Sequence, residues 1–121
     1  MRKKILIIDD DPAIIDSIQM LLEMEGYTVA TMIDGDQIHT MKQPFPDLIL
    51  LDIWMSGLDG RNIARFLKGK NETKHIPIIM VSASKDISKS AQESGVEDFL
   101  AKPFEMDELL AKVAKYVGNA V

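Results

Sequence analysis

The chain has 121 residues, no cysteine and a formal net charge of −5, with 46% hydrophobic and 27% charged residues. These values exclude disulfides and thiolate metal sites, and they argue against general affinity for nucleic acid, which requires clustered lysine and arginine. No apolar run approaches the ~18 residues of a membrane span or resembles a signal peptide. We therefore expect one soluble, cytoplasmic domain over residues 1–121.

Strands and helices alternate along the sequence. The first helix is the clearest, because Asp11 can act as its N-cap, Pro12 suits its first position and Gly26 ends it. In chain order the patterns predict a strand at 5–8, this helix, a strand at 28–32, a helix at 35–41, a strand at 48–51, a loop at 53–60, a helix at 60–68, a strand at 76–81, a helix at 86–94, a strand at 96–101 and a helix at 106–117.

Two helices carry apolar residues at helical spacing, which should form their buried faces. In the first helix these are Ile14, Ile18, Leu21 and Leu22. In the last helix they are Met106, Leu109, Leu110, Val113 and Val117.

The composition of the strands predicts their places in a sheet. Runs 5–8, 48–51 and 76–81 are almost wholly apolar, as strands covered on both faces should be, whereas 28–32 and 96–101 contain polar residues typical of edges. Alternation with helices favours an α/β fold. We predict a doubly wound, five-stranded parallel sheet of flavodoxin-like order 2-1-3-4-5, with helices on both faces and a ligand site beside the first and third strands.

Charged and hydroxyl side chains follow four of the predicted strands. Asp9 and Asp10 follow the first strand, Asp52 the third, Ser82 the fourth and Lys102 the fifth. Taken singly, each has an ordinary explanation, such as helix capping, a turn or a surface position. Together they converge on one edge of a parallel sheet, where three carboxylates repel one another unless a cation shares them.

This set of side chains predicts a site for a hard metal ion and a phosphoryl group. Asp10 and Asp52 suit direct ligation of Mg²⁺, and Asp9 suits ligation through water. Lys102 and Ser82 suit the oxygens of a phosphoryl group. An aspartate with both a metal and a lysine beside it is a nucleophile toward phosphorus.

Four segments carry a family resemblance: ILIIDDDP at 5–12, DLILLDIWMSGLDG at 47–60, IPIIMVSAS at 76–84 and DFLAKPF at 98–104. In this order and spacing the chain resembles the receiver domain of two-component response regulators over essentially its whole length. If the protein ends at Val121, we expect a single-domain regulator that binds a downstream target protein; if it is longer, a DNA-binding or enzymatic domain is the expected partner. The resemblance implies a cytoplasmic phosphoprotein rather than an enzyme acting on a separate substrate.

The resemblance also assigns roles to residues. Asp52 would accept a phosphoryl group from the phosphohistidine of a histidine kinase or a histidine phosphotransfer protein, and would later dephosphorylate itself. The ligands of Mg²⁺, or of Mn²⁺ in its place, would be Asp9, Asp10, Asp52 and the backbone carbonyl of Trp54. Lys102 would pair with the phosphoryl group, and Ser82 and Phe99 would switch the face formed by the helix at 87–94, the fifth strand and the last helix.

Three positions depart from the usual family pattern. Ser56 stands where proline is usual, Trp54 is bulkier than usual, and Phe99 replaces the commoner tyrosine. An aspartate-based phosphohydrolase is disfavoured because Trp54 occupies the place of its second acid. A flavin-binding module is disfavoured because residues 9–11 would repel the flavin phosphate. The remaining alternative is a degenerate receiver that docks proteins without being phosphorylated.

Overall fold

Five parallel strands form the central sheet of the computed structural model, which describes residues 2–55 and 58–118. Their order is β2-β1-β3-β6-β7, and every neighbouring pair is parallel. The predicted order 2-1-3-4-5 is therefore confirmed, with β1, β3 and β6 inside the sheet and β2 and β7 at its edges. The strands are β1 Lys4–Ile8, β2 Thr28–Met32, β3 Leu48–Asp52, β6 Ile78–Ser82 and β7 Asp98–Ala101.

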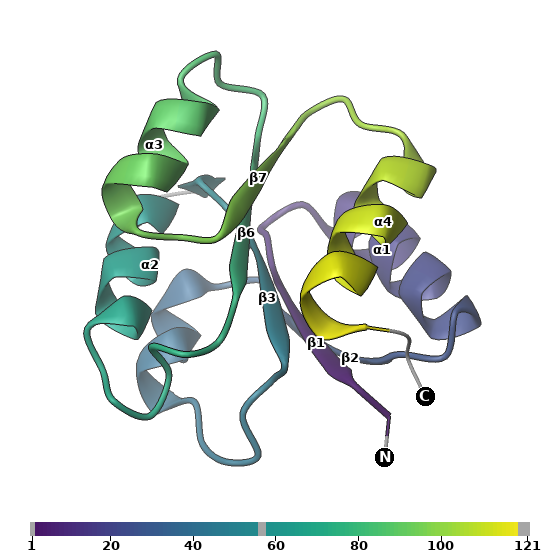
Figure 1. Ribbon diagram of the computed structural model, residues 1–121, viewed down its shortest axis with the longest axis horizontal. Coiled ribbons are helices and arrows are strands. Elements are labelled where there is room, and N and C mark those ends of the chain that lie inside the picture. The colour runs from purple at the N-terminus through teal and green to yellow at the C-terminus, as the bar shows by residue number, and fades with distance from the viewer. Residues whose placement is uncertain (1, 56–57, 119–121) are drawn as a thin grey trace.

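Helices cover both faces of this sheet (Figure 1). On one side lie α1 (Pro12–Met24) and α4 (Met106–Val117), and on the other lie α2 (Gly60–Lys68) and α3 (Ile87–Ser94). The helix predicted at 35–41 is present as the 3-10 helix η1, Gly35–Thr40. Asp11 caps α1 as predicted, because its side chain accepts from the backbone N–H groups of Ala13 and Ile14.

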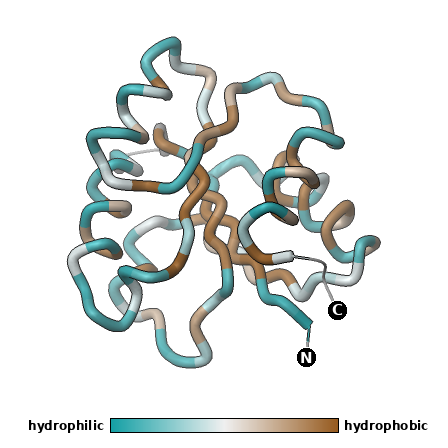
Figure 2. The backbone as a smooth tube through the Cα atoms, in the orientation of Figure 1, coloured by the Kyte–Doolittle hydropathy of each residue, from teal (hydrophilic) through white to brown (hydrophobic). Residues whose placement is uncertain are grey.

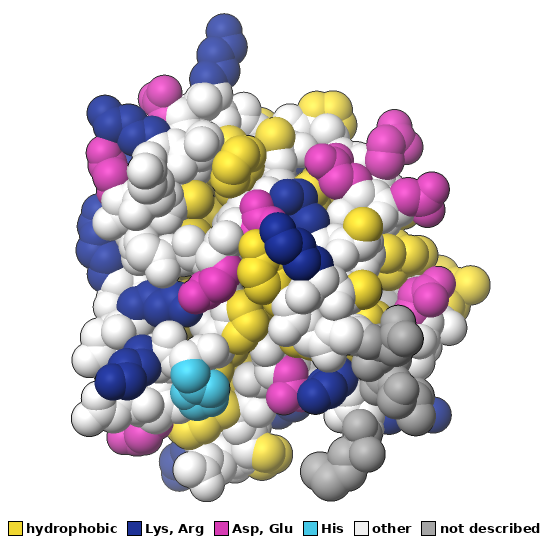
Figure 3. All heavy atoms as spheres, viewed as in Figure 1, with side chains coloured by type: hydrophobic (Ala, Val, Ile, Leu, Met, Phe, Trp, Pro, Cys, Tyr) yellow, Lys and Arg dark blue, Asp and Glu magenta, His cyan; other side chains and the backbone are white. Residues whose placement is uncertain are grey.

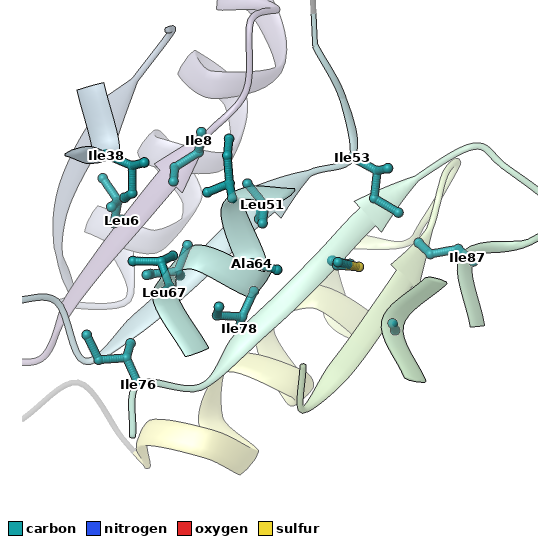
Figure 4. Packing of buried hydrophobic residues seen from close by; sticks show 14 residues of the cluster. Leu6, Ile8, Ile38, Leu51, Ile53, Ala64, Leu67, Ile76, Ile78 and Ile87 are labelled. Carbon is teal, nitrogen blue, oxygen red and sulfur yellow. The ribbon is translucent and has the colours of Figure 1, made fainter. Parts of the chain in front are cut away.

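The two faces of the sheet bury two separate apolar clusters, so the hydrophobic residues concentrate along the strands (Figure 2). In β1, Ile5 and Ile7 point to the α1–α4 side, whereas Leu6 and Ile8 point to the α2–α3 side. Figure 4 shows Leu6 and Ile8 among residues from η1, α2, β3 and β6. Burial on both faces explains why the central strands have almost no polar residues before their ends.

The predicted apolar faces of α1 and α4 pack against the sheet, except for Met106, but not all of their residues are fully buried. In α1 the buried residues are Ile15, Ile18 and Leu22, while Ile14 and Leu21 are only half-buried. In α4 only Leu109 and Val113 of the predicted five are buried, and Met106 is 43% exposed. Met106 begins α4 at the carboxyl edge of the sheet, where little strand remains for it to cover.

Several predicted boundaries were wrong by one or two residues. Strand β6 begins at Ile78 rather than 76 and extends to Ser82, and β7 begins at Asp98 rather than 96. The segment predicted as a loop contains two short antiparallel strands, β4 (Trp54–Met55) and β5 (Leu58–Asp59). Arms of two residues are too short to produce a periodic signal. The departure noted at Ser56 lies outside the described residues.

An ion pair between Lys68 and Glu97 lies at the amino edge of the sheet, opposite the acidic residues. Lys68 Nζ lies 2.8 Å from both carboxylate oxygens of Glu97 and donates to the carbonyl of Ile76, also at 2.8 Å. Glu97 also accepts from the backbone N–H of Ile78. The pair therefore joins the end of α2 to the starts of β6 and β7.

We expect Lys68→Met to lower the free energy of unfolding by about 1–3 kcal/mol, because it leaves a half-buried carboxylate and a carbonyl without their shared donor. Urea denaturation measures this change. Lys89→Met is the matched control: it removes an exposed pair with Glu93 at 3.8 Å, and should change stability by no more than about 0.5 kcal/mol. Equal effects of the two substitutions would contradict the expectation.

Candidate functional site

Three aspartates meet at the carboxyl ends of β1 and β3. Asp9 and Asp10 follow β1, and Asp52 is the last residue of β3. One carboxylate oxygen from each lies within 4.8 Å of the others. Asp9 and Asp52 are only 4% and 7% exposed, and Asp10 is more exposed. The predicted convergence of these residues is confirmed, and it falls where the strand order reverses.

Lys102 brings a positive charge to this cluster from a strand two places away. It follows β7 directly, and its Nζ lies 3.5 Å from Asp9 Oδ2 and 3.8 Å from Asp52 Oδ1. Its backbone N–H donates to the carbonyl of Ser82 at 2.9 Å, which ties the end of β7 to the end of β6. Three carboxylates and one ammonium leave two negative charges in excess, which matches a divalent cation.

Ser82 and Phe99 lie on the strands beside the acidic cluster. Ser82 ends β6, is 2% exposed, and accepts from the backbone N–H of Ser84 through its hydroxyl oxygen. Phe99 in β7 is half-buried and packs against the apolar cluster of the α2–α3 side. The ring of Phe99 therefore lies on the α2–α3 side of the sheet and not in the acidic cluster.

The hairpin β4–β5 determines where the Trp54 backbone lies. Trp54 pairs with Asp59 in antiparallel register, and the N–H of Gly60 donates to the carbonyl of Ile53 at 2.6 Å. This bond makes Trp54 and Asp59 a non-hydrogen-bonded pair, in which the backbone groups turn away from the opposite strand. The Trp54 carbonyl is thus left outside the hairpin ladder, two residues beyond Asp52.

Gly60 is essential to this geometry for a reason that the sequence did not reveal. A Cβ at this position would overlap the carbonyl oxygen of Asp52 and lie 2.8 Å from the Cα of Ile53. The start of α2 therefore packs directly on the backbone of Asp52. The Asp-Gly pair before a helical pattern signals a turn and a cap, but a close backbone contact depends on residues that the sequence does not place.

Asp59 caps α2 and forms an ion pair with Arg61 in the first turn of that helix. Its carboxylate accepts from the backbone N–H of Arg61 at 2.9 Å, and Arg61 Nη2 lies 2.6 Å away. The side-chain hydrogen bond from Arg61 lowers the pKa of Asp59 despite the opposing effect of burial. Sequence reasoning did not identify this pair, because nothing in the order of residues specifies the conformation of the Arg61 side chain.

The donor set fits Mg²⁺ or Mn²⁺. Carboxylate oxygens are the ligands that these hard cations prefer, and the separation within 4.8 Å compares with the ~3–4 Å between oxygens that share one such ion. The side-chain nitrogen at the site belongs to Lys102, an ammonium that cannot ligate a cation. The arrangement is therefore suited to a hard metal ion and an anionic oxygen group together.

An apolar recess of about 500 Å³ opens beside Lys102, between α1 and the segment that joins β7 to α4. Its lining residues are Ala13, Ile14, Ser17, Ile18, Ala83, Lys102, Pro103, Phe104 and Met106. Acidic and hydrophobic side chains gather over the start of α4 and the adjoining part of α1, at the upper right of Figure 3. Helix α1 itself contains no lysine or arginine.

The chain matches the family model of the response regulator receiver domain over residues 5–114. It is 42% identical over 113 residues to the DNA-binding dual master transcriptional regulator RpaA of Synechocystis, covering 91% of this chain and 47% of that protein. It is 36% identical to the DNA-binding response regulator MtrA of Mycolicibacterium smegmatis, covering 93% of this chain and 50% of that protein. The chain thus spans about half the length of these curated relatives.

Solved structures agree with the sequence matches. The receiver domain of NtrX from Brucella abortus is 31% identical with a TM-score of 0.83, covering 93% of this chain and 97% of that one. The receiver domain of the sensor histidine kinase PA1611 from Pseudomonas aeruginosa is 28% identical with a TM-score of 0.87, covering 98% of this chain and all of that one. That structure has a magnesium ion coordinated in its active site cleft.

Among the described residues, none of the helices has both the length and the apolar character that a membrane span requires.

We expect Gly60→Ala to lower the free energy of unfolding by about 1–3 kcal/mol, because the added methyl group must displace the backbone of Asp52. It should also shift the backbone amide resonance of Asp52. Gly69→Ala at the other end of α2 is the control, because its Cβ would lie 3.2 Å from the nearest backbone oxygen. A Gly60→Ala protein as stable as the control would show that the contact is absent.

A second expectation concerns Asp98, at the start of β7. Burial alone would raise its pKa, but hydrogen bonds from Lys112, the Phe99 N–H and Tyr116 outweigh burial and lower the pKa below 3.8. A carboxyl with a lowered pKa in the folded state stabilises the fold at higher pH, and this stabilisation is lost as pH falls below the ordinary value.

Asp98→Asn should therefore destabilise the protein at pH 7, and the difference from wild type should shrink as pH falls below about 4. Urea unfolding over a pH series measures this dependence. Lys112→Met removes the main partner at 3.0 Å, so it should reproduce the trend. A difference that is constant with pH would be the contrary result.

Proposed function

Because the chain belongs to the response regulator receiver domain family, we propose that it accepts a phosphoryl group on Asp52 from the phosphohistidine of a histidine kinase or a histidine phosphotransfer protein. The observation that carries this proposal is the meeting of Asp9, Asp10, Asp52 and Lys102 at one edge of the sheet. The roles of these residues follow from their positions and charges.

Asp52 is the best-placed acceptor of the three aspartates. It ends the central strand β3, pairs in register with Val81 of β6, and carries the close contact of Gly60 on its backbone. Asp9 Oδ1 accepts from the N–H of Asp11, and Asp9 Oδ2 lies 3.5 Å from Lys102 Nζ. Asp52 therefore combines a rigid backbone with a carboxylate that faces Lys102 at 3.8 Å.

Asp9, Asp10, Asp52 and the Trp54 carbonyl would hold Mg²⁺, and Mn²⁺ fits the same oxygen donors. When bound, the ion neutralises carboxylate charge and stabilises charge on the phosphoryl oxygens. The carbonyl of Trp54 is suited to this role because the hairpin ladder does not use it. The magnesium-bound cleft of the Pseudomonas aeruginosa receiver domain supports the assignment by similarity.

The transfer needs little more than position and charge. An oxygen of the Asp52 carboxylate forms the new bond to phosphorus while the phosphorus–nitrogen bond breaks, and the imidazole nitrogen keeps the electron pair. The transition state is loose, so the ammonium of Lys102 acts by stabilising charge on the transferring oxygens. The Ser82 hydroxyl would donate to one of these oxygens. Attack of water on phosphorus later releases inorganic phosphate and restores the carboxylate.

The docking partner would approach over the recess between α1 and the β7–α4 segment. Lys102 lines both this recess and the acidic cluster, so a helix seated there would present its phosphohistidine to Asp52. The half-buried Ile14 and Phe104 offer apolar contacts for that helix. The acidic residues Asp107 and Glu108 in the first turn of α4 favour a partner helix with basic residues beside its apolar ones.

Phosphorylation would switch the face formed by α3, β7 and α4 through Ser82 and Phe99. Helix α3 is weakly held, because it buries Ile87 and Ala91 together with two serines. One of these, Ser94, has a hydroxyl that is buried without a hydrogen-bond partner among the described residues. A buried hydroxyl without a partner costs about 1–3 kcal/mol, so α3 is the helix most easily shifted. A downstream protein would recognise the shifted face.

The relatives RpaA and MtrA are DNA-binding regulators. In a longer protein of that kind, this domain would control a DNA-binding segment without contacting nucleic acid itself, consistent with its net charge of −5.

The test is the intact mass after incubation with acetyl phosphate and Mg²⁺. We expect one added phosphoryl group, and no addition to Asp52→Asn or after chelation of the metal. Lys102→Ala should slow the modification by about 100-fold, by analogy with the loss of one charge-stabilising donor. Lys112→Ala is the matched control, because that lysine pairs with Asp98 instead of the acidic cluster.

Unchanged modification of Asp52→Asn would place the acceptor elsewhere. Absence of any adduct after rapid quenching would instead support the alternative of an unphosphorylated docking module.

A further inference from the structure

The ion pair between Asp59 and Arg61 is unusually complete for two residues so close in sequence. Arg61 Nε lies 3.0 Å from both carboxylate oxygens of Asp59, and Arg61 Nη2 lies 2.6 Å from Oδ2. The backbone N–H of Arg61 also donates to Oδ1. All of these hydrogen bonds to Asp59 therefore come from one residue. Both side chains are partly buried, at 31% exposed for Arg61 and 26% for Asp59, so solvent screens the pair only in part.

Asp59 is also the cross-strand neighbour of Trp54. Because the two form a non-hydrogen-bonded pair, no ladder bond runs directly between their backbones. The position of the Trp54 carbonyl therefore depends on the backbone of the whole hairpin. Two hydrogen bonds hold the base of the hairpin: the Gly60 N–H donates to the Ile53 carbonyl, and the Ile53 N–H donates to the Val81 carbonyl at 3.2 Å. On the β5 side, Asp59 stands directly before α2, and Arg61 ties its carboxylate to the first turn of that helix.

We propose that Arg61 is a positioning residue for the metal site: by gripping Asp59 it fixes β5, and through β5 it fixes the Trp54 carbonyl toward the cation held by the three aspartates. This inference rests on the proposed function, which assigns that carbonyl as a ligand. Arg61 touches neither the cation nor the phosphoryl group. It would act through the backbone of the hairpin.

Charge and position predict opposite effects of removing Arg61. Arg61 is a cation on the helix that follows the acidic cluster, so simple electrostatics predicts that its loss tightens binding of a divalent cation. Loss of the grip on Asp59 frees the hairpin and predicts weaker binding. Outer residues that orient a ligand typically contribute 10- to 100-fold to metal affinity. The direction of the change therefore separates the two effects.

Arg65 provides a matched control on the same helix. It stands one turn further along α2, is exposed, and donates to Asn62 at 3.1 Å. Arg65→Ala removes the same charge from α2 and leaves the Asp59–Arg61 hydrogen bonds in place, although the charge of Arg65 also lowers the pKa of Asp59. Arg61→Lys keeps the charge of Arg61 but cannot form the two-nitrogen grip.

The experiment measures Mn²⁺ affinity of the 121-residue chain from the loss of the free-ion EPR signal, with displacement by Mg²⁺, and records the melting temperature of each variant. We expect Arg61→Ala to weaken Mn²⁺ binding by about 10-fold, Arg61→Lys to weaken it less, and Arg65→Ala to leave it unchanged or slightly tighter. If Arg61→Ala does not fold, Arg61→Lys alone still provides the comparison with Arg65→Ala.

Unchanged or tighter binding in the Arg61 variants would overturn the positioning role and leave the proposed function standing. Equal weakening in the Arg61 and Arg65 variants would also overturn it, because the effect would then belong to α2 as a whole. If the wild-type chain binds neither ion, the assigned metal site fails, and the positioning role fails with it.

Discussion

Mutual repulsion among three carboxylates is the constraint around which the site is organised. Asp9, Asp10 and Asp52 lie within 4.8 Å of one another at one edge of the sheet, and two of them are nearly buried. Lys102 offsets part of this charge from β7. The excess negative charge that remains raises the free energy of the folded chain and attracts a cation. The acidic cluster therefore lowers the stability of the cation-free chain and favours binding of a cation.

The rest of the fold holds that edge in place. Apolar residues on both faces of β1 and β3 hold the strands whose ends carry the aspartates. At the opposite end, Lys68 and Glu97 join α2 to the starts of β6 and β7. At the carboxyl edge, Gly60, which is the first residue of α2, packs on the backbone of Asp52. Helix α2 is therefore attached to the sheet at both of its ends, whereas the buried residues of α3 are Ile87, Ala91 and two serines.

Most of the fold and much of the site could be predicted from the sequence. Continuous apolar runs identified the central strands, and Asp11 with Pro12 identified the start of α1. The hairpin at 54–59 could not be predicted, because its arms of two residues have no period to detect. The buried face of α1 was predicted without Ile15, because a helix with adjacent apolar residues offers two possible stripes. Only packing against the sheet selects between them.

The sequence by itself determined the alternation of strands and helices, and with it the parallel sheet and the edge at which charged residues gather. Those features depend on local periodicity and on the position of a residue relative to the end of its strand. Tertiary structure alone decided the contact of Gly60 with Asp52, the grip of Arg61 on Asp59 and the ion pair between Lys68 and Glu97. Each of these requires atoms whose separation is set by packing or by side-chain conformation, and the order of residues along the chain does not encode such distances directly.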